Sequence, residues 1–153
     1  MKQRFKYHPQ EHAGIRALRD LEIYLHGCGL ELPLLELVKM RASQINGCAY
    51  CLDMHSKDAR AAGETEQRLY ALDAWREAPF YTDRERAALD WTDAVTRVAD
   101  GHVPDEVYEH VKQHFDEQEL VNLTLAVVAI NGWNRLSISS RTEAGTYQPK
   151  PQG

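Results

Sequence analysis

The chain has 153 residues, of which 43% are apolar and 27% are charged, and these values are typical of one soluble globular domain. Its formal net charge of −5 argues against a nucleic acid as the partner. No stretch approaches the ~20 apolar residues that a membrane-spanning helix needs, and no apolar segment follows the N-terminus as in a signal peptide. Three cysteines with one close pair are not a secreted disulfide framework, so we expect a cytoplasmic protein.

Nearly every segment shows the apolar spacing of a helix, and no segment reads convincingly as a strand. Glycines, asparagine–glycine turns and capping patterns mark where the helices begin and end. Helices are expected at about residues 12–26, 33–45, 48–62, 65–75, 82–99, 104–115 and 116–140. We therefore predict an all-α class with a single domain at residues 1–141. Residues 142–153 are rich in glycine and proline and should form an extended or disordered tail.

The last helix is apolar around most of its circumference between residues 119 and 138. Such a helix must be buried on all sides. The amphipathic helices of one small domain are too few to cover all of its faces. We therefore expect a homo-oligomer in which this helix contributes to the core or to the interface. The three tryptophans, Trp75, Trp91 and Trp133, are expected in the core or in the interface as well.

The most informative stretch begins at Cys48, which is followed by Cys51 and His55 at helical spacing. On a helix of ~3.6 residues per turn these three side chains fall within about 60° of one another. Two neighbouring thiols can close a disulfide, and an imidazole one turn away can move a proton to or from the nearer thiol. Cys48 should also lie near a helix N-terminus, where positive charge lowers a thiol pKa. This arrangement suits thiol redox chemistry.

A carboxylate is expected beside the imidazole. The helices at residues 33–45 and 48–62 are joined by a two-residue turn, so they should lie antiparallel. At ~1.5 Å per residue, Glu36 and His55 lie ~15 Å and ~12 Å from that turn, at about the same height. A relay from Glu36 through His55 to Cys51 is therefore sterically plausible.

Other interpretations of these residues stay open. The cysteines could be structural, His55 could be a satisfied core residue, and Glu36 could form a solvated ion pair with Lys39. The pair with His55 and a fourth ligand such as Glu36 could bind zinc, although one continuous helix is a poor frame for a tetrahedron. A non-catalytic oligomeric scaffold is a third class. Cys28 is expected to be a spare buried thiol.

The pattern formed by Glu36, Cys48-Ala-Tyr-Cys51 and His55 resembles the AhpD-type alkylhydroperoxidase motif of the carboxymuconolactone decarboxylase superfamily. The flanking residues 36–47 and 61–64 and the Trp133-Asn134-Arg135 segment resemble the same family, so the likeness covers about residues 15–140. It implies an AhpD-like helical bundle with the Cys-x-x-Cys at a helix N-terminus. It also implies assembly as trimers or hexamers without a metal, haem or flavin.

The resemblance implies a mechanism as well. Cys51 would attack a hydroperoxide, and Cys48 would resolve the sulfenic acid and meet a dithiol reductant. Glu36 and His55 would relay protons. Tyr50 stands where the best-known members carry a histidine, and a tyrosine cannot act as a base near neutral pH. The decarboxylase branch works without this cysteine pair, so its reaction is not expected.

Overall fold

The computed structural model describes residues 2–149 as a bundle of helices, with no β-strand in that range. The elements are α1 (Ala13–His26), α2 (Leu32–Asn46), α3 (Ala49–Ala61), α4 (Glu66–Ala71), the 3₁₀ helix η1 (Leu72–Ala74), α5 (Asp83–Thr96), α6 (Val98–Gly101), α7 (Asp105–Val111) and α8 (Glu117–Ser140). The predicted all-α class is confirmed. None of the described helices is long and apolar enough to cross a membrane.

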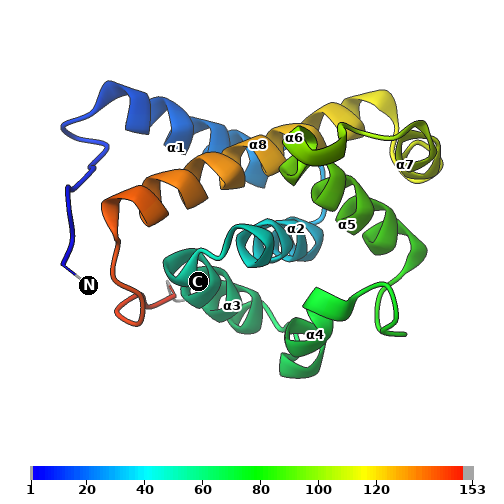
Figure 1. Cartoon of the computed structure of the whole chain (residues 1–153), viewed down its shortest axis with the longest axis horizontal. Helices are drawn as coiled ribbons and strands as arrows, with labels where there is room; N and C mark the ends of the chain where they lie inside the picture. The colour runs from blue at the N-terminus through cyan, green and yellow to red at the C-terminus, as the bar shows by residue number, and fades with distance from the viewer. Residues whose placement is uncertain (1, 150–153) are drawn as a thin grey trace.

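Helix α2 is the centre of the bundle, and α3, α5 and α8 pack around it (Figure 1). Pro33 occupies its first turn, where a missing backbone N–H leaves no hydrogen bond unmade. Every residue from Leu37 to Ser43 is buried. Because α2 touches helices on several sides, its polar residues are enclosed along with its apolar ones.

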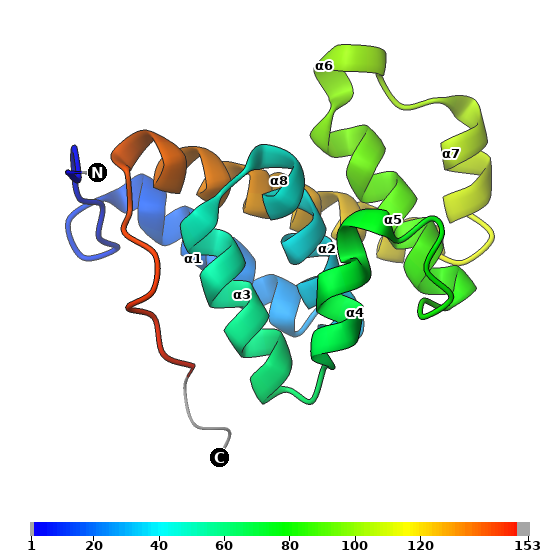
Figure 2. The same cartoon turned by 60° about the horizontal axis from the view of Figure 1, so that its bottom comes forward.

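Two apolar clusters share α2. One cluster joins α2 to α1, α5, α7 and α8, and the other joins it to α3, α4, η1 and the middle of α5. Figure 2 shows α3 and α4 beside α2. Trp91 belongs to the first cluster and Trp75 to the second, as expected for core residues. Leu25 and Leu72 are fully enclosed on the two sides. This packing fixes α1, α3 and α8 around one end of α2.

The expected helix at residues 82–99 is wrong in its last part. Thr82 and Glu85 form a complete capping box that starts α5. At Arg97 the backbone turns to φ −99° and ψ 28°, and the chain restarts as the short helix α6. Residues 97–102 are exposed, so no tertiary packing holds them on the axis of α5.

A single chain leaves part of α8 uncovered. Leu123, Val127 and Ile130 are fully buried against the bundle. Val121 and Val128 are 50% and 52% exposed on the other side of the helix. The expectation that α8 is buried on all sides is therefore not met within one chain, and the assembly that would cover it stays a prediction.

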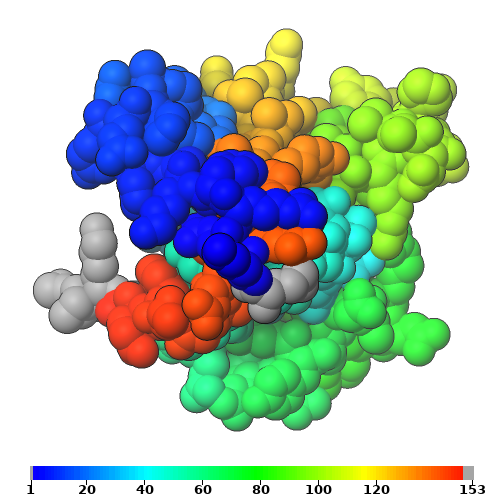
Figure 3. All heavy atoms as spheres, turned by 60° about the vertical axis from the view of Figure 1, so that its left-hand side comes forward, coloured from blue at the N-terminus to red at the C-terminus, as the bar shows by residue number. Residues whose placement is uncertain are grey.

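The N-terminal segment lies over the end of α8, and the segment that follows α8 runs beside it (Figure 3). The backbone N–H of Arg4 donates to the carbonyl of Ser140 at 2.8 Å. After α8, residues 143–149 contain no helix or strand, yet they contact α3. There Gly145 donates its N–H to Asp53 at 3.0 Å, and the hydroxyl of Tyr147 donates to Asp58 at 2.8 Å.

Candidate active site

The cysteine pair lies at the sharp turn between α2 and α3. Gly47 ends α2 with φ 67°, a left-handed conformation that glycine adopts without the Cβ clash of other residues. The N–H of Cys48 then donates to the carbonyl of Ser43 at 3.0 Å. Cys48 caps α3, and its sulfur accepts the N–H of Cys51 at 3.3 Å. The chain therefore delivers the two cysteines to the first turn of α3.

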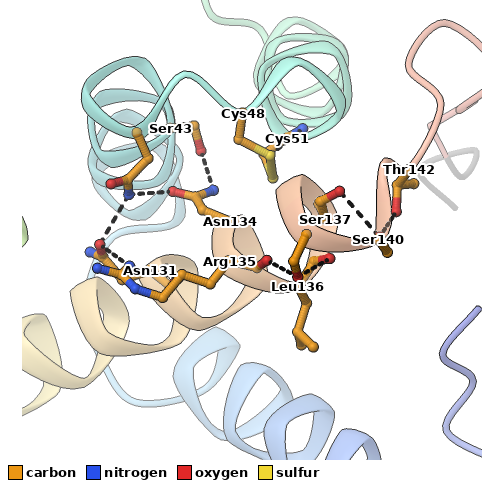
Figure 4. The surroundings of a disulfide bond; sticks show 12 residues. Ser43, Cys48, Cys51, Asn131, Asn134, Arg135, Leu136, Ser137, Ser140 and Thr142 are labelled. Atoms are coloured by element: carbon orange, nitrogen blue, oxygen red, sulfur yellow. Dashed lines mark hydrogen bonds between the residues drawn. A yellow bond between two sulfur atoms is a disulfide. The ribbon is translucent and has the colours of Figure 1, made fainter. Parts of the chain in front are cut away.

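Cys48 and Cys51 form a disulfide with a Cα–Cα distance of 5.3 Å (Figure 4). Each cysteine is only 1% exposed. Cys28 is a free, partly buried cysteine elsewhere in the fold. The disulfide is therefore almost entirely shielded from solvent.

A chain of side-chain amides fastens this turn to α8 (Figure 4). The side-chain N–H groups of Asn46 donate to Asn131 at 3.0 Å and to Asn134 at 2.8 Å. Asn134 in turn donates to the hydroxyl of Ser43 at 3.0 Å, and both of these residues are fully buried. Buried amides that are fully paired restrict movement, so α8 helps to fix the position of the disulfide.

Beside the disulfide, Glu36 of α2 meets His55 of α3. The Nδ1 atom of His55 lies 2.9 Å from Oε2 of Glu36. The other carboxylate oxygen of Glu36 lies 3.3 Å from Nζ of Lys39, which also lies 3.1 Å from Glu22 of α1. Lys39 is 2% exposed. Glu36 therefore contacts His55, as the relay requires, and also forms the ion pair with Lys39. Both contacts are largely buried, so the ion pair is not a solvated one.

The neighbours of Glu36 determine its pKa. Burial by itself raises the pKa of a carboxylic acid. The hydrogen bond and charge of His55, together with the ammonium group of Lys39, outweigh that effect and lower the pKa of Glu36 to about 2. Burial lowers the pKa of Lys39, but Glu36 and Glu22 overcome it and raise that pKa above its ordinary value. Glu36 is therefore ionised and Lys39 protonated at neutral pH.

A pocket of about 310 Å³ opens beside Cys51. It is enclosed by α1, α2, α3, α8 and the N-terminal segment, and its lining includes Cys51, His55, Glu36 and Lys39. Trp133 of α8 also lines it and is only partly buried in one chain, so it does not lie in the core, and its position at an interface between chains stays a prediction. The pocket brings a redox sulfur, an imidazole and a carboxylate to one space.

Tyr50 forms part of the same wall. Burial raises its pKa above the ordinary value, and the nearby Tyr7 and Asp53 raise it further. Tyr50 is therefore protonated at neutral pH and can donate a hydrogen bond but cannot accept a proton as a base.

A second hollow, of about 320 Å³, lies next to Cys48 and shares Tyr50 and Ser137 with the first pocket. Cys48 lines this hollow, whereas Cys51 lines the first pocket. The far wall is the end of α8, with Ser137, Arg141 and Thr142. Each sulfur-bearing residue therefore has its own approach from the surface.

The structure brings together all four residues that the sequence singled out, Glu36, Cys48, Cys51 and His55. It adds Glu22, whose contact with Lys39 joins α1 to α2 and has no signal in sequence spacing. Within residues 2–149, no group of three or more His, Cys, Asp or Glu side chains is placed to hold a metal ion.

Residues 9–94 match the sequence profile of the carboxymuconolactone decarboxylase family. The uncharacterized protein YdfG of Bacillus subtilis is 43% identical over 146 residues, which cover 95% of this chain and 99% of that protein. The chain belongs to the carboxymuconolactone decarboxylase family.

Solved structures agree with this assignment. A protein of unknown function from Agrobacterium tumefaciens, ATU0492, has a suggested role in antioxidant defence as AhpD. Its structure matches with a TM-score of 0.90 at 41% identity, covering 95% of this chain and all of that one. The debrominase Bmp8 matches with a TM-score of 0.77 at 19% identity, over 85% of this chain and 70% of that one, which is a likeness of fold alone. The fold is therefore AhpD-like, as the sequence predicted.

Proposed function

We propose that the protein is a thiol-dependent peroxidase that reduces hydroperoxides through a cycle of the Cys48 and Cys51 dithiol and disulfide. The observation that carries this proposal is the shared pocket, in which Cys51 lies beside the Glu36–His55 pair. A buried pair of cysteines without acid–base groups would suit a structural bridge equally well. The combination with an ionised, hydrogen-bonded relay favours catalysis.

In the proposed cycle, the thiolate of Cys51 attacks the terminal oxygen of ROOH. The O–O bond breaks, Cys51 becomes a sulfenic acid, and RO⁻ takes a proton to leave as ROH. The thiol of Cys48 then attacks the sulfenic sulfur, which forms the disulfide and releases water. A dithiol reductant restores both thiols and is itself oxidised to a disulfide, so two electrons pass from the dithiol to the hydroperoxide.

His55 is the proton carrier in this scheme. It takes the proton of the Cys51 thiol and later donates a proton to the alkoxide RO⁻ as the O–O bond breaks. Both steps are within reach because His55 and Cys51 line one pocket. Glu36 orients the ring through Nδ1 and stabilises the imidazolium that forms. Lys39 keeps Glu36 ionised.

The two hollows suggest separate routes for the two substrates. The hydroperoxide enters beside Cys51, and the dithiol reductant attacks Cys48 from the hollow that ends at α8. A pair that must be reduced in each cycle needs a reducing setting, so we place the protein in the cytoplasm. The suggested antioxidant role of the Agrobacterium relative agrees with this scheme.

Metal analysis and thiol titration together test the proposal against its alternatives. Reduced protein should carry no stoichiometric zinc, and one equivalent of cumene hydroperoxide should remove two of the three titratable thiols. Mass spectrometry should then find Cys48 linked to Cys51. One zinc per chain with protected thiols would favour a metal-binding module, and thiols that resist peroxide would favour a scaffold.

A further inference from the structure

The pocket beside Cys51 has a strongly apolar wall. Four side chains form it: Tyr7, Tyr50, Met54 and Trp133. The rings of Tyr7 and Trp133 lie 6.3 Å apart between centroids, within the range in which aromatic pairs attract each other. A volume of about 310 Å³ is at the small end for ligand pockets, so the carbon group that enters must be compact.

Tyr7 reaches the pocket because the N-terminal segment is fastened to the end of α8 (Figure 3). Its hydroxyl lies 2.9 Å from the hydroxyl of Ser137, while the backbone of Arg4 bonds to Ser140. Phe5, in the same segment, is 46% exposed and does not line the pocket. The segment thus contributes one aromatic wall.

The remaining wall carries a net negative charge. The lining includes three carboxylates from three different helices and one ammonium group. The carboxylates are Glu22, Glu36 and Asp58, and the ammonium group is that of Lys39. The two histidines that line the pocket are His26 and His55, and protonation of either one leaves the balance negative. Because the carboxylates in the lining outnumber the ammonium group, the pocket as a whole repels an anionic group.

Each carboxylate is held in place. Asp58 accepts the hydroxyl hydrogen of Tyr147 with both oxygens, at 2.8 and 3.0 Å. Glu22 and Glu36 share Lys39. Fixed charges cannot turn away from an incoming anion, so repulsion persists throughout binding.

We propose that this pocket selects uncharged hydroperoxides with a compact aromatic or bulky apolar carbon group and rejects those that carry a carboxylate. The selection rests on the proposed function and names the substrate class for it. Hydrogen peroxide is uncharged but gains nothing from the apolar wall, so it is the poorer substrate.

A matched pair of substrates tests the selection. Cumene hydroperoxide with a para-carboxylate and its methyl ester share the same reacting group and differ in charge. At pH 7 the ester should be reduced with a kcat/KM roughly 10-fold higher than the acid, the value expected for one fixed charge at close range. Equal kcat/KM values, or a faster acid, would overturn the proposal.

Two variants, each with a matched control variant, locate the residues that select the substrate. Asp58→Asn should narrow the ester-to-acid ratio roughly threefold, whereas Asp105→Asn, which removes the same charge from α7 at the far end of the molecule (Figure 1), should leave the ratio unchanged. Tyr7→Ala should lower kcat/KM for cumene hydroperoxide several-fold more than it lowers kcat/KM for hydrogen peroxide. Phe5→Ala is the matched control within the same segment.

Binding of the two corresponding alcohols to the disulfide form, measured by NMR, tests the charge selection without any turnover. The ester alcohol should bind roughly 10-fold more tightly than the carboxylate alcohol. If neither hydroperoxide is reduced but the ester alcohol binds better, the proposed function fails while the selection stands. Equal binding of the two alcohols would refute the selection itself.

Discussion

The Nδ1 atom of His55 lies 2.9 Å from Oε2 of Glu36, although the two residues are 19 positions apart in sequence. The contact links α2 to α3 beside the disulfide. It orients the imidazole of His55 toward the pocket that Cys51 lines, and the account of activity depends on it.

The relay is tested by changing its two members. His55→Ala or Glu36→Gln should slow hydroperoxide reduction roughly 10²–10⁴-fold, the usual contribution of a general acid–base group. Helix content by circular dichroism should be nearly unchanged in both. Full activity in Glu36→Gln would return this residue to a purely structural ion-pair role. The exposed Glu11 provides a control, since Glu11→Gln should have no effect.

The depressed pKa of Glu36 predicts how stability depends on pH. A carboxyl group with a folded pKa of about 2 stabilises the fold above its unfolded pKa, near 4.5, and loses this contribution as pH falls through the folded value. The contribution at neutral pH is at most about 3 kcal/mol. Urea unfolding at several pH values should show the difference between the wild type and Glu36→Gln narrowing from pH 6 toward pH 2. A difference in the free energy of unfolding that stays constant between pH 6 and pH 2 would contradict the lowered pKa of Glu36.

Lys39 should matter far more than a lysine on the surface. Lys39→Met leaves two carboxylates without their buried ammonium partner, and removal of one member of a buried ion pair costs about 3–5 kcal/mol. Lys57→Met also removes an ion pair, with Asp53, but the side chain of Lys57 is 31% exposed, so its loss should cost less than about 1 kcal/mol. Chemical denaturation measures the free energy of unfolding of both variants. Similar losses of stability in Lys39→Met and Lys57→Met would contradict the special role of the buried lysine.

Sequence patterns were sufficient for most of the fold. Gly47 predicted the end of α2, and the residues around Thr82 and Asp116 predicted capping boxes that the structure contains. The helical phase of Cys48, Cys51 and His55 predicted their common inward position. These signals succeed because they depend on neighbours within one or two turns.

Contacts between distant segments left no such signal. The Glu22–Lys39 pair depends on the crossing of α1 and α2, which a single sequence does not fix. Tyr7 enters the pocket only because its segment returns to α8. Trp133 lines the pocket and not the core, which spacing could not predict because it cannot distinguish a wall of a pocket from a packed interior, and its predicted place at an interface stays a prediction.

The amide chain should matter to both stability and redox behaviour. Asn134→Ala removes two buried hydrogen bonds, those with Asn46 and Ser43, and should destabilise the protein by about 1–3 kcal/mol. The freed turn should also change the rate at which a dithiol reduces the disulfide. Ser139→Ala on the exposed side of α8 is the control and should alter neither quantity. Unchanged stability and reduction rate in Asn134→Ala would refute this role.

The uncovered face of α8 predicts a homo-oligomer, and the family resemblance implies that it is a trimer or hexamer. Light scattering at micromolar concentration should give a mass several times 17.5 kDa. Val128→Glu should lower that mass, because the residue is 52% exposed in one chain and should become buried in the assembly. Tyr70→Glu, at a residue on α4 that is 73% exposed, should leave the mass unchanged. A stable wild-type monomer would refute the assembly.

The central claim is that Cys51 attacks the hydroperoxide and Cys48 resolves the product. Mass spectrometry of reduced Cys48→Ser treated with one equivalent of cumene hydroperoxide and a sulfenic-acid trap tests it most directly. The account predicts one trapped sulfenic acid on Cys51 and one equivalent of cumyl alcohol, with no trapped product at Cys48 in Cys51→Ser. A trapped sulfenic acid on Cys48 in Cys51→Ser, or alcohol formation that survives the loss of Cys51, would contradict it.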